Sequence, residues 1–254
     1  MILNSGELMT KILHALEQHL PCSVVSLGAT ETFVLAQETV LTQRQIMTHA
    51  EAKVANLGIR RGHQHRGIRF PNLTARDALA KALREADILG RNLLINTPDS
   101  GQITKRVMKY HKIEPQYIFE AYIRRVIMFS QKQKFEHMLK GRKILIICGY
   151  ADEVAAAMNK NLKKLLNFEI VGAIKIHEFE EIPRAKKEID LLDFDLALLA
   201  AGLNAIILAA YIAKFKGKVA FDLGQGMESL ITGQIVDEYN FLGESIGIVN
   251  LFDL

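Results

Sequence analysis

Hydrophobic positions gather most clearly in the C-terminal half of the chain, where apolar runs alternate with glycine turns. Residues 196–201 form a short continuous apolar run bounded by turn residues, which is typical of a strand buried on both faces. Gly202 interrupts the run, and Asn204 is placed to cap an apolar helix over residues 205–215. The pattern therefore predicts a strand, a glycine turn and a helix in close succession.

A second unit of strand and turn follows directly. Residues 219–221 predict another strand, which ends at Asp222 and at the turn 223–226 that contains Gly224. Parallel-sheet proteins bind ligands at the carboxyl ends of their strands. The pattern therefore places a candidate site where these two strands end.

Residues 196–213 also fit a competing interpretation as a membrane span. The run is 18 residues long, which is near the length that crosses a bilayer. Gly202 and Asn204 break it in the middle, and no second span accompanies it. We therefore expect a buried strand and helix of a soluble protein, and no membrane span.

Strands and helices alternate along the rest of the chain as well. Further strands are predicted at residues 23–27, 88–95, 143–148, 168–176 and 246–250. Further helices are predicted at residues 5–20, 32–37, 42–57, 71–87, 102–111, 113–129, 152–166 and 182–192. This alternation predicts an α/β protein with a Rossmann-like, mostly parallel sheet and helices on both faces. We expect a single domain over residues 1–254, with a candidate internal boundary in the polar, basic segment 132–142.

Composition narrows the class of protein. The net charge is +4 and the pI about 9.0, but Lys and Arg are spread along the chain, so no specific nucleic-acid partner is expected. Charged side chains within residues 1–20 exclude a secretory signal, which favours the reducing cytoplasm. Cys22 and Cys148 form no CxxC motif and lie in separate strand-like runs. We expect both thiols to be buried, reduced and not bonded to each other.

One local cluster of basic residues stands out, in the loop IRRGHQHRGIRF at residues 59–70. Its four arginines are Arg60, Arg61, Arg66 and Arg69. Guanidinium groups match the oxygens of a diphosphate, and His63 and His65 resemble a pair of metal ligands. The pair lacks a third ligand nearby, so a solvated basic loop is the favoured interpretation.

Two glycine turns invite comparison with nucleotide-binding loops. The turn at Gly149 supplies one glycine where the dinucleotide fingerprint needs three, which disfavours an enzyme that uses NAD or S-adenosylmethionine. The turn that begins at Gly202 is better placed, because backbone N–H groups at a helix N-terminus bind phosphate. A tight turn that needs glycine only for packing explains this pattern equally well.

Five segments, in order, carry a resemblance to a known family. They are SLGATETFVLAQ (26–37), FPNLTARDALAKALREADILG (70–90), GRKILIICG (141–149), FDLALLAAGLNAIIL (194–208) and FDLGQGMESL (221–230). Together they resemble the bacterial GT-D fold glycosyltransferases over nearly the whole chain. The resemblance implies a Rossmann-like fold and transfer of a sugar from a nucleotide-sugar donor to an unknown glycan or protein acceptor. It also implies a divalent cation, Mn²⁺ or Mg²⁺, bound through an Asp-x-Glu motif after the first strand.

The chain departs from the family at this motif. Ala29 stands where the family has Asp, whereas Glu31 keeps the place of the Glu. A divalent cation prefers several hard oxygen ligands. Glu31 and water would then hold the metal at reduced affinity, or the chain binds its donor without metal. A non-catalytic relative that binds nucleotides or nucleotide-sugars is the third alternative.

The resemblance assigns the candidate site residues as follows. Glu31 is expected to contact the metal or the donor sugar. Asp222 is a candidate base toward an acceptor hydroxyl, with a turn-capping role as the alternative. The nucleotide pocket is expected to be lined by Gly28, Gly202, Asn204 and Gly224.

Overall fold

The computed structural model describes residues 1–58, 66–94, 101–237 and 241–254. Within them, eight strands form one sheet in the order β1-β4-β3-β2-β8-β7-β5-β6. The strands are β1 (Ile2–Leu3), β2 (Cys22–Leu27), β3 (Ile88–Arg91), β4 (Tyr117–Glu120), β5 (Lys143–Cys148), β6 (Glu169–Ile174), β7 (Leu196–Ala200) and β8 (Val219–Asp222). Every pairing between these strands is parallel. The predicted α/β class with a Rossmann-like parallel sheet is confirmed.

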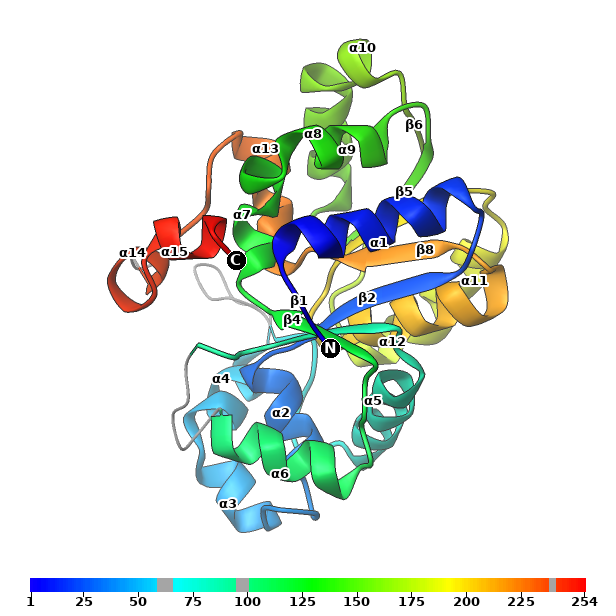
Figure 1. The fold of residues 1–254 in the computed structure, drawn as a ribbon. Coiled ribbons are helices and arrows are strands. Elements are labelled where there is room, and N and C mark those ends of the chain that lie inside the picture. Colours follow the sequence, from blue (N-terminus) through cyan, green and yellow to red (C-terminus); the bar gives the residue numbers. More distant parts are fainter. Residues whose placement is uncertain (59–65, 95–100, 238–240) are drawn as a thin grey trace.

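Helices cover both faces of the sheet (Figure 1). One face carries α2 (Ala29–Ala36), α3 (Gln43–Thr48), α4 (Ala50–Leu57), α5 (Leu73–Glu85), α6 (Ile103–Tyr110), α11 (Ile182–Asp190) and α12 (Leu203–Tyr211). The other face carries α1 (Ser5–Glu17), α7 (Ile123–Ser130), α8 (Lys132–Leu139), α9 (Ala151–Asn161), α10 (Lys163–Leu166), the 3₁₀ turn η4 (Gly224–Glu228) and α13 (Ser229–Thr232). Each face buries its own hydrophobic cluster against the strands, as expected for a parallel sheet.

The long apolar run divides as the sequence predicts. β7 ends at Ala200, and α12 begins at Leu203 after Gly202, whose φ of +55° is a conformation that favours glycine. All but the last residue of α12 is buried, which accounts for the apolar side chains that follow Asn204 along it. No helix in the described part of the chain is long and apolar enough to cross a membrane.

Two elements differ in type from the prediction. Residues 113–129 do not form one helix, because Tyr117–Glu120 pairs with both β3 and β1 as strand β4 before α7 begins. Pairing with neighbouring strands outweighs local helix propensity here. Residues 246–250 do not form a last strand. Gly247 (φ +81°) starts helix α15 (Ile248–Phe252), whose Leu251 packs with Val126 of α7.

Three smaller differences concern element boundaries. The predicted helix over residues 42–57 splits at His49, which ends α3 and caps α4 through its Nδ1 atom. The helix over residues 152–166 divides into α9 and α10 at Leu162. The two-residue strand β1 has no sequence signal, and it forms by pairing with β4.

The segment proposed as an internal boundary is helical. It contains α8, whose Phe135, Met138 and Leu139 are buried in the same cluster as residues of α1. The sheet also continues across the two halves, because β2 pairs with β8.

Both cysteines behave as expected. Cys22 in β2 and Cys148 in β5 are buried and not bonded to each other. Burial raises the pKa of each thiol to about 12, so neither is a thiolate near neutral pH.

Candidate functional site

The connections that leave the central strands indicate which edge of the sheet is a candidate for ligand binding. The chain leaves β2 and β7 into α2 and α12 on one face, and leaves β5 and β8 into α9 and η4 on the other. Because neighbouring strands send their helices to opposite faces, the carboxyl ends of β2, β8, β7 and β5 are left uncovered by these connections. The candidate site is therefore built from the residues that follow these strands.

Glu31 lies at this edge because α2 begins earlier than predicted. The helix starts at Ala29 with Gly28 as its N-cap, so Glu31 falls in the first turn and its Oε2 accepts the Gly28 N–H at 3.0 Å. A carboxylate in the first turn also complements the helix dipole. The side chain points inward and only 7% of the residue is exposed.

Two of the predicted pocket glycines make room for this carboxylate. A Cβ atom on Gly28 would lie 2.6 Å from Oε2 of Glu31, closer than any packed contact allows. A Cβ atom on Gly202 would lie 3.3 Å from Oε1 of the same group. The ends of β2 and β7 therefore meet around Glu31.

Asp222, the last residue of β8, lies between these two strand ends and is paired with a cation. Its Oδ2 accepts a short hydrogen bond from Nη1 of Arg124, and its Oδ1 accepts the Gly224 N–H at 3.0 Å. The Asp222 side chain is only 4% exposed. The turn-capping role considered for Asp222 is therefore present, together with an ion pair.

Arg124 belongs to a segment that the sequence offers either as a core helix, the favoured interpretation, or as an aromatic and basic ligand wall, and it was not assigned to the site. It sits in the first turn of α7, which packs against η4 and brings it to the end of β8, 98 residues away along the chain. A Cβ atom on Gly224 would lie 2.8 Å from Nη1 of Arg124. Gly224 is thus required here for the close approach of the guanidinium. The adjacent pair Arg124 and Arg125 at the start of a largely apolar helix is the sequence signal for a basic group here.

Burial dominates the electrostatics of the two carboxyl groups. It raises the pKa of Glu31, an effect increased by the nearby Asp222 and opposed by the N–H groups of Glu31 and Gly28 and by Arg124. Burial likewise raises the pKa of Asp222, against the opposing effect of Arg124. A carboxyl group with a raised pKa in a strand-end site is a candidate for proton transfer or for hydrogen bonding to a ligand.

Asn204 does not cap α12, because Gly202 occupies the N-cap position. The Asn204 side chain is fully buried, and its Nδ2 donates to the carbonyl oxygen of Gly67 at 3.3 Å. Its Oδ1 has no hydrogen-bond partner in the described part of the chain. Asn204 therefore holds residues 66–67 against the end of β7, and a role in lining the nucleotide pocket stays a prediction.

The basic loop is only partly described. Arg60, Arg61, His63 and His65 lie outside the described residues. Arg66 pairs with Glu51, whose Oε2 lies 3.3 Å from Nε and also accepts the Thr30 hydroxyl at 2.9 Å. Arg69 pairs with Glu178 at 3.2 Å. Glu51 thus links Arg66 to Thr30 in the first turn of α2, and Thr30 is the residue before Glu31.

The residues present do not fit the divalent cation that the resemblance implies. Such a cation needs several hard oxygen ligands, and Ala29 provides none. One oxygen of Glu31 already accepts a backbone N–H, and Asp222 is neutralised by Arg124. No group of three or more His, Cys, Asp or Glu side chains able to hold a metal occurs among the described residues.

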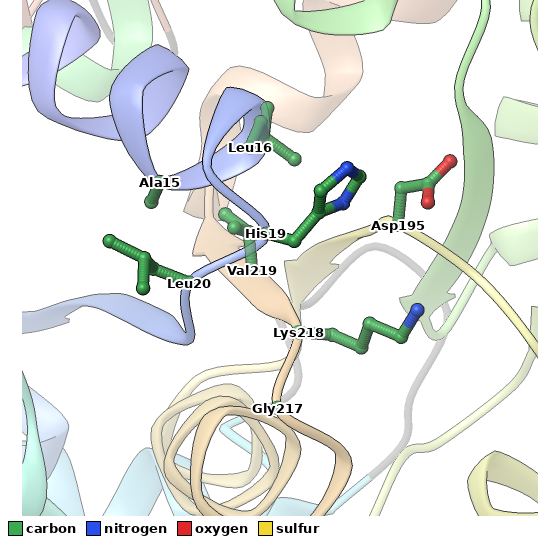
Figure 2. Close-up of a pocket in the computed structure, with 8 residues that line it drawn as sticks. All are labelled: Ala15, Leu16, His19, Leu20, Asp195, Gly217, Lys218 and Val219. Atoms are coloured by element: carbon green, nitrogen blue, oxygen red, sulfur yellow. The ribbon is translucent and has the colours of Figure 1, made fainter.

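A pocket also lies at the opposite edge of the sheet, where the strands begin. Figure 2 shows this pocket between the end of α1 with the turn that follows it, which contributes Leu16 and His19, and the residues just before β7 and β8, which include Asp195 and Lys218. None of the predicted site residues lines it. The pocket has titratable groups of its own, His19, Asp195 and Lys218, and it is separate from the strand-end residues described above.

The fold is that of an α/β protein in which the candidate site residues gather at the carboxyl edge of a parallel sheet. The GT-D-like family, described as a GT-D fold-like domain, matches residues 3–230. The chain belongs to this family, which confirms the predicted resemblance.

Solved structures agree with this assignment at the level of the fold. One, described as a highly conserved domain of unknown function 1792 with a distinct glycosyltransferase fold, is 15% identical with a TM-score of 0.58 and covers 97% of this chain and 89% of its own. Another, a new glycosyltransferase from Streptococcus sanguinis, is 14% identical with a TM-score of 0.58 and covers 92% of this chain and 86% of its own. No curated protein matches the chain.

Proposed function

We propose that this protein is a glycosyltransferase that takes a sugar from a nucleotide-sugar donor bound at the carboxyl ends of β2, β8 and β7. The observation that carries the proposal is the meeting of Glu31, Gly202 and Asp222 at that edge, from three separate parts of a chain in the GT-D-like family. Donor sites of parallel α/β proteins lie at this edge. The acceptor is a glycan or a protein.

Glu31 is the carboxyl group we assign to the donor sugar. Its raised pKa favours a proton on the group, which then donates a hydrogen bond to a sugar hydroxyl or to the leaving oxygen. Asp222 is a weaker candidate for the base toward the acceptor, because both of its oxygens already accept hydrogen bonds and it is more deeply buried than Arg124.

A second candidate function is favoured by a specific observation. Ala29 stands in the place of the family Asp, and the two remaining carboxylates are engaged by protein groups. This arrangement also suits a relative that binds nucleotide-sugars without catalysis. Turnover separates the two functions, because both bind the donor and only the first releases nucleotide.

The test uses a panel of nucleotide-sugars, with binding followed by calorimetry and donor hydrolysis by release of nucleotide. Gly202→Ala places a methyl group against Glu31 at a φ where an L-residue is strained. We expect it to weaken donor binding by about tenfold or more while the protein remains folded, because the methyl group displaces the Glu31 carboxyl group, and losing a hydrogen bond to a charged group costs roughly 1.5–3 kcal/mol.

Gly217→Ala is the matched control. Gly217 also has a positive φ (+63°), but no atom lies within 4 Å of its added Cβ. It should cost stability and leave donor binding unchanged. If Gly202→Ala binds donors as tightly as wild type does, the site lies elsewhere.

A further inference from the structure

The strand-end cluster, defined as Glu31, Arg124 and Asp222, presents its positive group to solvent. The Arg124 side chain is 17% exposed, against 4% for Asp222, and Glu31 is buried. A ligand that approaches this edge of the sheet therefore meets the guanidinium before it meets either carboxylate.

The guanidinium also retains hydrogen-bond donors. Its Nε donates to the Ala121 carbonyl oxygen at 3.2 Å, and Nη1 donates to Asp222. Nη2 makes no hydrogen bond to any described residue, and it is not among the fully buried unpaired atoms. An arginine side chain carries five N–H donors in a planar fork that matches phosphate oxygens, so the N–H groups of Nη2 are left for an anion.

The position of the guanidinium is fixed by the fold. Gly224 lies against its Cζ, Nη1 and Nη2 atoms, and Gly226 lies against the Arg124 carbonyl, where an added Cβ would be 2.3 Å away. Because both glycines pack against Arg124, its side chain is already ordered in the folded protein. Ligand binding then loses little further side-chain entropy. A charge held in place before the ligand arrives is the arrangement that stabilises phosphate groups most effectively.

We propose that Arg124 provides the positive charge that binds the diphosphate of the donor, in place of a divalent cation. The inference rests on the proposed function and adds the residue and the metal independence to it. A guanidinium in contact with Asp222 repels a dication from the oxygens that would have to bind it. Ala29 removes a carboxylate that would bind the metal, and the guanidinium of Arg124 supplies a fixed positive charge in place of that metal.

The experiment measures binding of UDP and of inorganic pyrophosphate by calorimetry, in EDTA and in Mn²⁺. Wild type should bind both in EDTA, with little gain from Mn²⁺. Arg124→Gln should weaken binding about 10- to 100-fold, the usual effect of losing a hydrogen bond to a charged group. Arg84→Gln is the matched control, since Arg84 is exposed and bonds the His111 carbonyl oxygen far from the site.

Two further variants keep the test decisive if Arg124→Gln does not fold. Arg124→Lys keeps the charge without the fork, and it should weaken binding by a smaller factor than the Gln variant. Asp222→Asn removes the competing carboxylate with little change of shape, and it should leave pyrophosphate binding in EDTA equal or tighter. Circular dichroism establishes that each variant is folded.

The outcomes separate the inference from the proposed function. UDP binding that requires Mn²⁺, is lost in Glu31→Gln and is indifferent to Arg124 would overturn the inference and leave the function standing. Pyrophosphate binding that depends on Arg124, without binding or turnover of any nucleotide-sugar, would overturn the function alone. Failure of both UDP and pyrophosphate to bind would overturn both.

Discussion

At the scale of the residue, Glu31 shows that a sequence motif can identify a buried side chain without predicting its contacts. The sequence identifies it as the surviving carboxylate of a metal motif, whereas in the structure it folds back on Gly28 and faces Gly202. The two glycines were predicted as backbone donors for a nucleotide. The contact distances show that both glycines make room for Glu31, and their role in a nucleotide pocket stays a prediction.

The raised pKa of Glu31 predicts a particular dependence of stability on pH. Its pKa lies above the ordinary value of 4.5 in the folded protein, so the native state holds more protons than the unfolded state as pH rises from 4.5. Stability from this group is therefore fully present below pH 4.5 and is lost as pH rises through the folded pKa.

Glu31→Gln removes this titration and still offers an oxygen to the Gly28 N–H. We expect the variant to become progressively more stable than wild type as pH rises, measured as the difference in free energy of unfolding from urea titrations at each pH. A difference that is flat with pH would show that Glu31 is ionised in the folded protein at all these pH values.

At the scale of the element, the sequence was most informative where hydrophobic runs end at glycine. β7, β8, β5 and α12 were all predicted, because buried parallel strands and their helices leave unbroken apolar runs. β4 was taken for part of a helix, since its four residues are placed by pairing with β3 and β1. The local sequence does not predict such pairing.

This error had a consequence for the site. With residues 113–129 interpreted as one helix, Arg124 had no defined direction and no reason to meet Asp222. Only the β4–α7 connection turns it toward η4, and that geometry depends on contacts between segments nearly a hundred residues apart. The positions of Glu31 and Asp222 could be predicted because both residues follow the carboxyl ends of parallel strands. The position of Arg124 could not, because it depends on tertiary packing.

Helix α5 provides a test of an element boundary, because Asn72 and Thr74 are both residue types that cap helices. In the structure Asn72 caps the helix by accepting the Ala75 N–H at 2.9 Å, and Thr74 is exposed in the first turn. Asn72→Ala should destabilise the protein by about 0.5–2 kcal/mol, because a backbone N–H loses its partner. Thr74→Ala, the control, should change stability by no more than about 0.5 kcal/mol. Urea denaturation midpoints measure both, and equal values would show that Asn72 does not cap α5.

At the scale of the whole molecule, the two halves of the chain share one sheet and both cores. Residues 1–142 supply β1 to β4 and residues 143–254 supply β5 to β8, and the halves join where β2 pairs with β8 from Cys22 and Val219 onward. Each hydrophobic cluster contains residues from both halves. Strand pairs at the join and the clusters beside it therefore form only when both halves are present.

We accordingly predict one cooperative unfolding transition, although the segment 132–142 reads in the sequence as a boundary. Unfolding in urea should give the same midpoint by circular dichroism and by tyrosine fluorescence, since the chain has six tyrosines and no tryptophan. Residues 1–142 and 143–254 expressed separately should each lack the dispersed amide spectrum of a folded protein, because each exposes an edge strand and half of both cores. Separate transitions for the two probes, or a folded fragment on its own, would show that the boundary divides two domains.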